Sequence, residues 1–206
     1  MSQNKKQNED LRVRRTRKML MQALIDLTIE KGFSTITVQD IAERAMINRA
    51  TFYRHYLDKY DLLDKYMNEV YEMTASQETS NSLATTGGED VGAAPRGMVS
   101  MFAHVQQHAD FYRVMIGPKG DPAFIERGRQ FSEMRLRSLI PRKHKKLKPN
   151  SPPLELCLSY LAYAGMGAIA WWLNEGRAYT PQQVASWCDQ LYHEAIAHVF
   201  GKTIAS

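Results

Sequence analysis

The sequence predicts an all-α protein, and three observations lead to that prediction. Apolar residues recur at helical spacing over most of the 206 residues. No segment shows the alternation of apolar and polar residues that is typical of a half-buried strand. Glycine and proline interrupt the helical pattern at intervals, as at Gly117-Pro118 and Pro152-Pro153.

The N-terminal part of the chain divides into a polar arm and a helical domain. Residues 1–11 are rich in Asn, Gln and Lys, which predicts a disordered basic arm. Residues 12–59 are expected to form a domain of three helices. The first covers about 12–31, where leucines lie near one stripe, and Gly32 stands where this helix should end.

Two shorter helices are expected next. Thr37 precedes Asp40 by three residues, which resembles a capping box and predicts the start of a short second helix. Asn48 can cap a third helix over about 49–56. Only two or three residues join these helices, and a pair of that size is typical of a helix-turn-helix unit.

The third helix is predicted to have an apolar and a polar face. Phe52 and Tyr56 are four residues apart, so both lie on the inward face. Arg49 stands at the start of the helix, where its fork of donors can reach a guanine edge. The outward positions are Arg49, Ala50, Thr51, Tyr53 and Arg54.

Residues 60–206 are expected to form a second, larger helical domain. A Ser-, Thr- and Gly-rich stretch at 76–94 predicts a loop within it. The helices expected in this domain cover about 60–77, 95–108, 109–116, 121–140, 153–174 and 180–200.

Charge is distributed unevenly along the chain. Residues 1–60 carry 12 Lys and Arg against 7 Asp and Glu, whereas residues 61–206 carry 15 of each kind. All of the net charge of +5 therefore lies in the first sixty residues. A basic N-terminal domain beside a neutral one indicates a polyanionic partner for the basic domain.

Other function classes find little support in the sequence. Cys157 and Cys188 form no CxxC or Cys/His pattern, and the N-terminus has no apolar signal segment, so a reducing cytoplasm is the expected location. No glycine-rich phosphate loop, nucleophile elbow or paired metal motif is present, so we expect no enzyme, no metal and no cofactor.

The helix-turn-helix segment resembles the TetR family of transcriptional regulators. The likeness covers about residues 12–65. It is carried by the segments Thr37-Val38-Gln39-Asp40-Ile41-Ala42-Glu43-Arg44-Ala45 and Ile47-Asn48-Arg49-Ala50-Thr51-Phe52-Tyr53-Arg54-His55-Tyr56, followed by Lys59 and Leu62-Leu63. The resemblance implies that the partner is duplex DNA. A homodimer would then bind a pseudo-palindromic operator with one helix-turn-helix unit in each half-site.

Roles for individual residues follow from this resemblance. It implies that Thr37, Tyr53, His55 and Lys59 contact the DNA backbone and set the register. Sequence preference would come from Arg49, Ala50 and Thr51, by contacts with base edges. The complete set of DNA-binding candidates is Thr37, Gln39, Arg49, Ala50, Thr51, Tyr53, Arg54, His55 and Lys59.

Two residues depart from the family pattern. Met46 follows Ala45 where the family often has glycine, and a positive φ there would cost a methionine about 1 kcal/mol. Ala50 also stands where glycine is common, which favours the helix and leaves base recognition at this position open.

For the larger domain the resemblance implies an effector pocket and a dimer interface. The last two long helices, about 153–174 and 180–200, would pair with their copies. The apolar stretch 154–173 is also long enough to span a bilayer, but Gly165 and Gly167 dilute its apolarity, and an interface helix is equally apolar. We therefore expect no membrane association.

The body domain is rich in methionine and aromatic residues, which suits either plain core or a flexible apolar pocket. The protein is expected to be a repressor. A small, mostly apolar or aromatic effector is expected to release it from its operator. An alternative is a regulator whose body binds a protein partner instead. The effector-pocket candidates are Met67, Tyr71, Met98, Phe102, Phe111, Met115, Met134, Tyr160, Tyr163, Met166 and Trp171.

Overall fold

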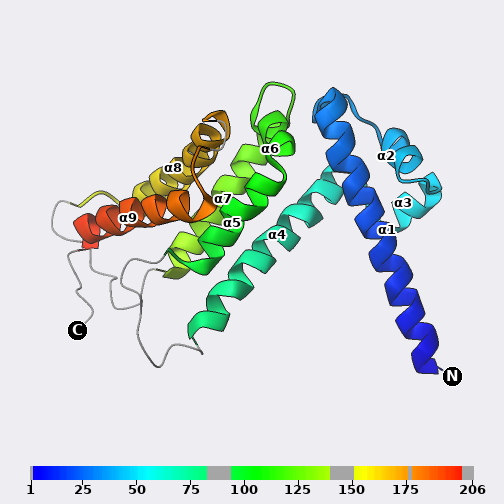
Figure 1. Ribbon diagram of the computed structural model, residues 1–206, viewed down its shortest axis with the longest axis horizontal. Helices are drawn as coiled ribbons and strands as arrows, with labels where there is room; N and C mark the ends of the chain where they lie inside the picture. The colour runs from blue at the N-terminus through cyan, green and yellow to red at the C-terminus, as the bar shows by residue number, and fades with distance from the viewer. Residues whose placement is uncertain (1, 83–93, 140–150, 176–177, 201–206) are drawn as a thin grey trace. The chain divides into compact units, whose positions relative to one another are not determined.

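The computed structural model describes residues 2–82, 94–139, 151–175 and 178–200, and these form helices and short connections with no strand (Figure 1). The predicted all-α class is confirmed. The elements are α1 (Ser2–Lys31), the 3-10 turn η1 (Phe33–Thr35), α2 (Val38–Arg44), α3 (Arg49–His55), α4 (Lys59–Ser82), α5 (Arg96–Gln107), α6 (Ala109–Ile116), α7 (Pro122–Leu139), α8 (Leu154–Asn174) and α9 (Pro181–Phe200).

The first helix is longer than the sequence predicts. α1 begins at Ser2, so the segment expected to be a disordered arm is helical in this structure. Lysine and glutamine are frequent here, and neither glycine nor proline occurs before Gly32. These residues are good helix formers, and extending an existing helix costs much less than nucleating a new one.

The chain forms two compact units. The first comprises residues 1–70 and 110–121, and the second comprises 71–109 and 122–206. The first unit thus includes the start of α4 and most of α6, which lie beyond the expected boundary at residue 60. Tyr66 of α4 and Phe111 of α6 stack edge to face there, with ring centroids 5.9 Å apart.

The core of the first unit holds the helix-turn-helix together. α1 packs against α2, and α2 packs against α3 (Figure 1). Large side chains with almost no exposed surface fill the space between them, and burying each contributes roughly 1.5–3 kcal/mol relative to exposure. These side chains include Leu20, Leu24, Phe33, Ile41, Phe52, Leu62 and Leu63.

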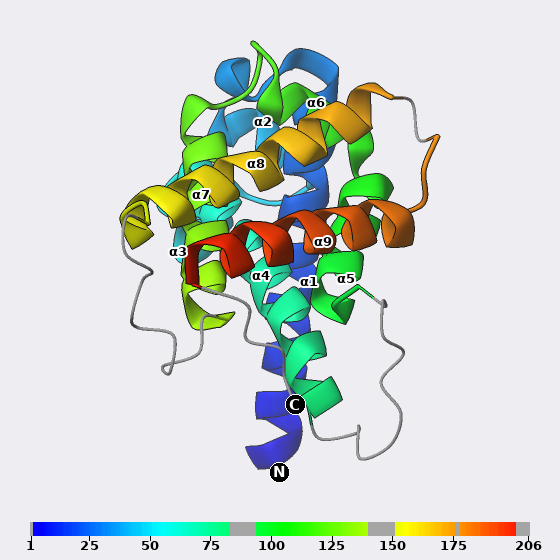
Figure 2. The ribbon, with the colours of Figure 1, turned by 90° about the vertical axis from the view of Figure 1, so that its left-hand side faces the viewer.

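The second unit pairs α7 with α8 and α5 with α9 (Figure 2). One part of its core consists of Leu136, Leu158, Leu161 and Ala162, with Tyr192 and Ile196 of α9 packed against them. At the other end of α8, Trp172 stacks edge to face on Phe102, with centroids 5.4 Å apart, and donates to the carbonyl of Tyr179 at 3.0 Å.

α8 is the one helix, among the described residues, that is long and apolar enough to cross a membrane. That property rests on its length of 21 residues and on its apolar composition alone. Only 28% of the apolar stretch within α8 is buried inside the chain, so much of the apolar surface of this helix is uncovered.

Candidate DNA-binding site

The N-terminus of α2 is fixed by the predicted capping box. The backbone N–H of Asp40 donates to the Thr37 hydroxyl at 3.2 Å, and the backbone N–H of Thr37 donates to the Asp40 carboxylate at 2.7 Å. Lys31 donates to the same carboxylate at 2.7 Å. The hydrogen bond from Lys31, and to a smaller extent those from Thr37, hold the pKa of the Asp40 carboxylate well below its usual range. The capping prediction is confirmed, and the box holds Thr37 and the exposed Gln39 in place at the start of α2.

The turn between α2 and α3 has one residue in the left-handed conformation, and this residue is Met46, for which the conformation is unfavourable. Met46 has φ 54° and is 87% exposed. Its N–H donates to the carbonyl of Glu43 at 3.0 Å, and the N–H of Ile47 donates to that of Ala42 at 3.0 Å. The backbone follows the tight path that glycine adopts freely, while the methionine side chain extends into solvent.

Helix α3 has the two faces that the sequence predicts. The Asn48 side chain caps it by accepting from the N–H of Ala50 at 2.7 Å. Phe52 and Tyr56 are buried with ring centroids 5.7 Å apart. Thr51 is half-buried. The exposed residues of α3 are Arg49, Ala50, Tyr53 and Arg54.

Arg49 and Tyr53 form a pair on the exposed face of α3. The Arg49 guanidinium donates to the Tyr53 hydroxyl at 3.0 Å, and its central carbon lies 5.4 Å from the centre of the Tyr53 ring. Their four-residue spacing is the sequence signal that places the two side chains together on the helix. The hydroxyl accepts from Arg49 and keeps its own hydrogen for another acceptor.

Lys59 holds the η1 turn. Its ammonium donates to the carbonyls of Phe33 at 2.9 Å, Ser34 at 3.2 Å and Ile36 at 2.8 Å. Burial lowers the pKa of Lys59. An ammonium has three hydrogens, and three carbonyls engage them here. Lys59 is also a candidate for contact with the DNA backbone, and in this structure its ammonium fixes the turn before α2.

His55 lies half-buried at the end of α3. Lys65 of α4 donates to the His55 carbonyl at 3.1 Å and to Asp61 at 2.9 Å, which fixes the junction between α3 and α4. Burial, followed by the charges of Arg17, Arg54 and Lys65, lowers the pKa of His55. The imidazole is therefore neutral near pH 7.

The effector-pocket candidates divide between the two units. Met67, Phe111 and Met115 are buried in the first unit. In the second unit Phe102 is buried, and Tyr71, Met98 and Met166 are half-buried. The other candidates are exposed side chains of the second unit: Met134, Tyr160, Tyr163 and Trp171.

The four exposed candidates do not line the interior of this chain. Tyr160 is 71% and Met134 60% exposed. For the three candidates on α8, Tyr160, Tyr163 and Trp171, helix phase could not predict this, because α8 is apolar on nearly all sides and its sequence marks no single buried face. The candidates that remain for an effector pocket inside the chain are the seven buried and half-buried residues.

Two family profiles match this chain. The one described as "Bacterial regulatory proteins, tetR family" covers residues 20–66, and the one described as "Transcriptional regulator C-terminal region" covers residues 94–194. The chain belongs to the TetR family of transcriptional regulators. This is a family of DNA-binding regulators and not of enzymes.

Curated relatives match mainly the helix-turn-helix. The chain is 45% identical over 60 residues to the HTH-type transcriptional regulator YxbF of Bacillus subtilis (strain 168), which is 29% of this chain and 16% of that protein. It is 33% identical over 69 residues to YdeS of the same organism, 33% of this chain and 35% of that protein. The matched segments thus span about a third or less of these relatives.

Solved structures show the same fold along most of the chain. A TetR regulator from Streptococcus agalactiae 2603V superposes with a TM-score of 0.62 at 22% identity, covering 90% of this chain and 98% of that one. The dihydroxyacetone kinase operon activator DhaS superposes with a TM-score of 0.60 at 19% identity, with the same coverage. At such identities the likeness shows the fold alone.

Proposed function

We propose that the protein is a homodimeric repressor that binds a pseudo-palindromic operator and leaves it when a small apolar or aromatic effector binds. The observation that carries this proposal is the exposed polar face of α3, held rigidly by Phe52 and Tyr56 below it. A capped helix with an outward arginine near its start has the form that enters the major groove.

Contacts to DNA would divide into two kinds. Arg49 would donate to a guanine edge, with Ala50 and Thr51 beside it. The Tyr53 hydroxyl would donate its free hydrogen to a phosphate. The remaining candidates for backbone contacts are Thr37, Gln39, Arg54 and His55, with Lys59 acting through its charge.

The homodimer would form through α8 and α9. These helices expose large apolar side chains that a soluble monomer seldom leaves in contact with water. A second copy would cover them in an isologous interface, as in a two-fold dimer. The exposed residues are Leu156, Tyr160, Tyr163 and Trp171 of α8, and Trp187 and Leu191 of α9.

The effector would bind in the second unit, where α7 meets α8. Tyr71 of α4 and Phe131 of α7 stack beside this contact, with ring centroids 3.6 Å apart. A Cβ at Gly128 would lie 2.7 Å from the sulfur of Met166, so α7 and α8 approach closely at this point. An aromatic effector could replace these ring and sulfur contacts and shift the equilibrium between operator-binding and released states. No observation favours a protein partner instead.

Sedimentation analysis tests the dimer. Tyr160→Glu places a charge on the exposed surface of α8, so we expect a monomer that keeps its helical content and loses affinity for an inverted-repeat duplex. Gln107→Glu introduces the same charge at an exposed residue of α5 and should remain dimeric. If Tyr160→Glu stays dimeric with unchanged affinity, α8 is not the interface.

We also propose that the protein acts in the cytoplasm.

A further inference from the structure

Helix α8 has two apolar faces on opposite sides. On the inner face Leu158, Leu161 and Trp172 are buried within the second unit. The other side of the helix is exposed, and Figure 2 shows α8 and α9 on the side of this unit that faces the viewer, over α7 and α5. The exposed residues recur at spacings of three or four and carry no charge. We call them the outer face of α8, and they are Leu156, Tyr160, Tyr163, Ala164, Gly167 and Trp171.

Large and small side chains are separated along the outer face. Leu156, Tyr160 and Tyr163 come first, and Ala164 and Gly167 follow. A Cβ added at Gly167 would meet nothing within 4 Å, so no described neighbour in this chain requires glycine there. Glycine in the middle of a helix is unfavourable relative to alanine. A partner that packs closely against the helix at this point would explain why a side chain is absent.

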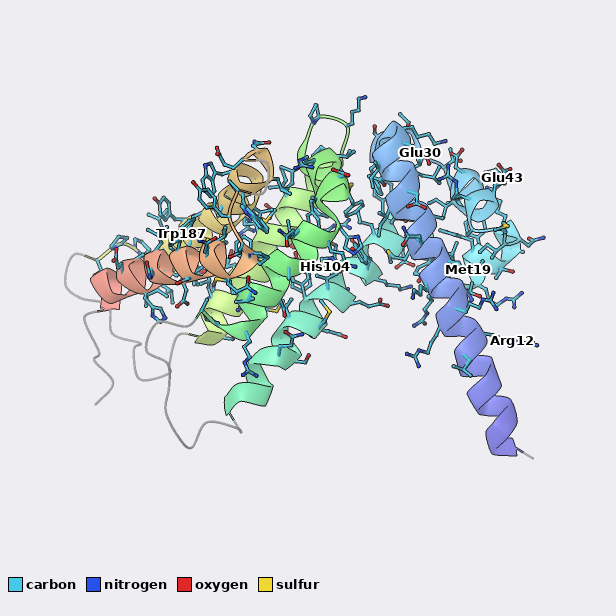
Figure 3. The ribbon with its side chains drawn as sticks, viewed as in Figure 1. Arg12, Met19, Glu30, Glu43, His104 and Trp187 are labelled. Carbon is cyan, nitrogen blue, oxygen red and sulfur yellow. The ribbon has the colours of Figure 1, made fainter. Side chains whose placement is uncertain are left out.

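Contacts within the chain hold aromatic residues of the outer face in place. The Tyr163 hydroxyl donates to the Glu126 carboxylate of α7 at 3.4 Å. Trp171 stacks on Tyr179 with ring centroids 5.7 Å apart. Tyr179 in turn lies edge to face against Trp187 of α9, labelled in Figure 3, with centroids 5.1 Å apart. Side chains that are ordered before a partner binds lose less conformational entropy on association.

We propose that two copies of the chain pair antiparallel through the outer face, with Tyr160 of each copy seated on Gly167 of the other. In a two-fold dimer, residues at equal distances from the axis on the two copies oppose one another. An axis between Tyr163 and Ala164 opposes Tyr160 to Gly167, because both lie equally far from it along the helix. Large side chains of one copy then meet small ones of the other, and the helix axes can approach to about 8 Å. The pairing rests on the proposed homodimer and adds its register.

The same axis accounts for the ends of the outer face and for the kind of partner. It opposes Leu156 to Trp171, so apolar side chains meet at both ends. A pattern that is complementary to itself fits a second copy, whereas an unrelated partner has no need of that symmetry. A bilayer fits less well, because α9 exposes Gln190 and Glu194 beside Trp187. A polar rim around an apolar centre is instead typical of a protein interface.

Disulfide cross-linking tests the register. We expect Tyr160→Cys combined with Gly167→Cys to form a covalent dimer under mild oxidation, with mass spectrometry placing the bond between positions 160 and 167. Neither single variant should cross-link, because equivalent positions lie about 10 Å apart along the helix, beyond the reach of a disulfide. Leu156→Cys combined with Gly167→Cys, about one turn out of register, is the matched control. The wild type, which has Cys157 and Cys188, is oxidised in parallel.

An exchange of side-chain size tests the contact itself. Gly167→Leu fills the place of Tyr160 from the other copy and should raise the Kd of the dimer about tenfold, because overpacking is destabilising. Its own chain leaves this space open, so circular dichroism should show unchanged helical content. Adding Tyr160→Ala to Gly167→Leu should recover most of the lost affinity. Ala103→Leu, at an exposed small residue of α5, should leave the Kd unchanged.

The outcomes distinguish the register from the dimer itself. A monomeric wild type in sedimentation would overturn the homodimer and the register with it. A dimeric wild type whose double cysteine variant does not cross-link, or losses from Gly167→Leu and Tyr160→Ala that add, would overturn the register alone. A monomer that sediments with phosphatidylcholine vesicles would assign the outer face to a bilayer and would also overturn the pairing.

Discussion

Tyr53→Phe separates two roles proposed for the Tyr53 hydroxyl group, which are to position Arg49 and to donate to a DNA phosphate. The substitution keeps the ring, and thus its contact with the Arg49 guanidinium at 5.4 Å, but removes the oxygen that accepts from Arg49 at 3.0 Å. Both side chains are exposed, so folding should be unaffected. An intramolecular hydrogen bond of this kind is worth about 1 kcal/mol net, or roughly fivefold in affinity per subunit.

The assay measures affinity for an operator and for a duplex changed at the base pair that Arg49 contacts. If Tyr53 positions Arg49, Tyr53→Phe should lower the ratio of the two affinities, and it should have no further effect on this ratio when added to Arg49→Ala. Tyr60→Phe, at another exposed tyrosine of the same unit, is the control. An equal loss on both duplexes would refute positioning and leave only a phosphate contact.

Two further predictions concern backbone geometry in the first unit. Met46→Gly should raise the free energy of unfolding in urea by about 0.5–1 kcal/mol, because it relieves φ 54° at a side chain that packs against little; a lower midpoint would contradict the left-handed turn. Gly32→Ala should lower it by about 2 kcal/mol, because φ is 84° and the new Cβ would lie 2.9 Å from the Lys119 Cβ and 3.0 Å from its carbonyl oxygen; unchanged stability would show that residues 117–121 do not pack on Gly32.

The helix-turn-helix could be predicted because its signals are local. A cap such as Thr37 and its partner Asp40 lie three residues apart, and the buried pair Phe52 and Tyr56 lies four apart. Short spacing fixes such contacts once a helix forms. The cost at Met46 could be predicted for the same reason, since the turn type demands a positive φ whatever surrounds it.

Contacts between distant residues could not be predicted. Lys59 reaches carbonyls 23 to 26 residues earlier in the chain, and Lys119 packs on Gly32. No periodicity in the sequence reports such pairs. The exposure of the pocket candidates Tyr160, Tyr163 and Trp171 could not be predicted, because α8 is apolar on almost every side and burial depends on its neighbours and not on helix phase.

Selection from a pool of random duplex DNA most directly tests whether the protein is a dimer that recognises an operator sequence. The purified wild type is incubated with the pool at near-physiological salt, the bound fraction is sequenced, and Arg49→Ala is treated in parallel. We predict an inverted repeat with half-sites about 34–36 Å apart, or a multiple of that distance, for the wild type. Arg49→Ala should lose this preference while remaining folded. Unrelated sequences bound with a steep salt dependence, or the same repeat selected by Arg49→Ala, would contradict base recognition by α3.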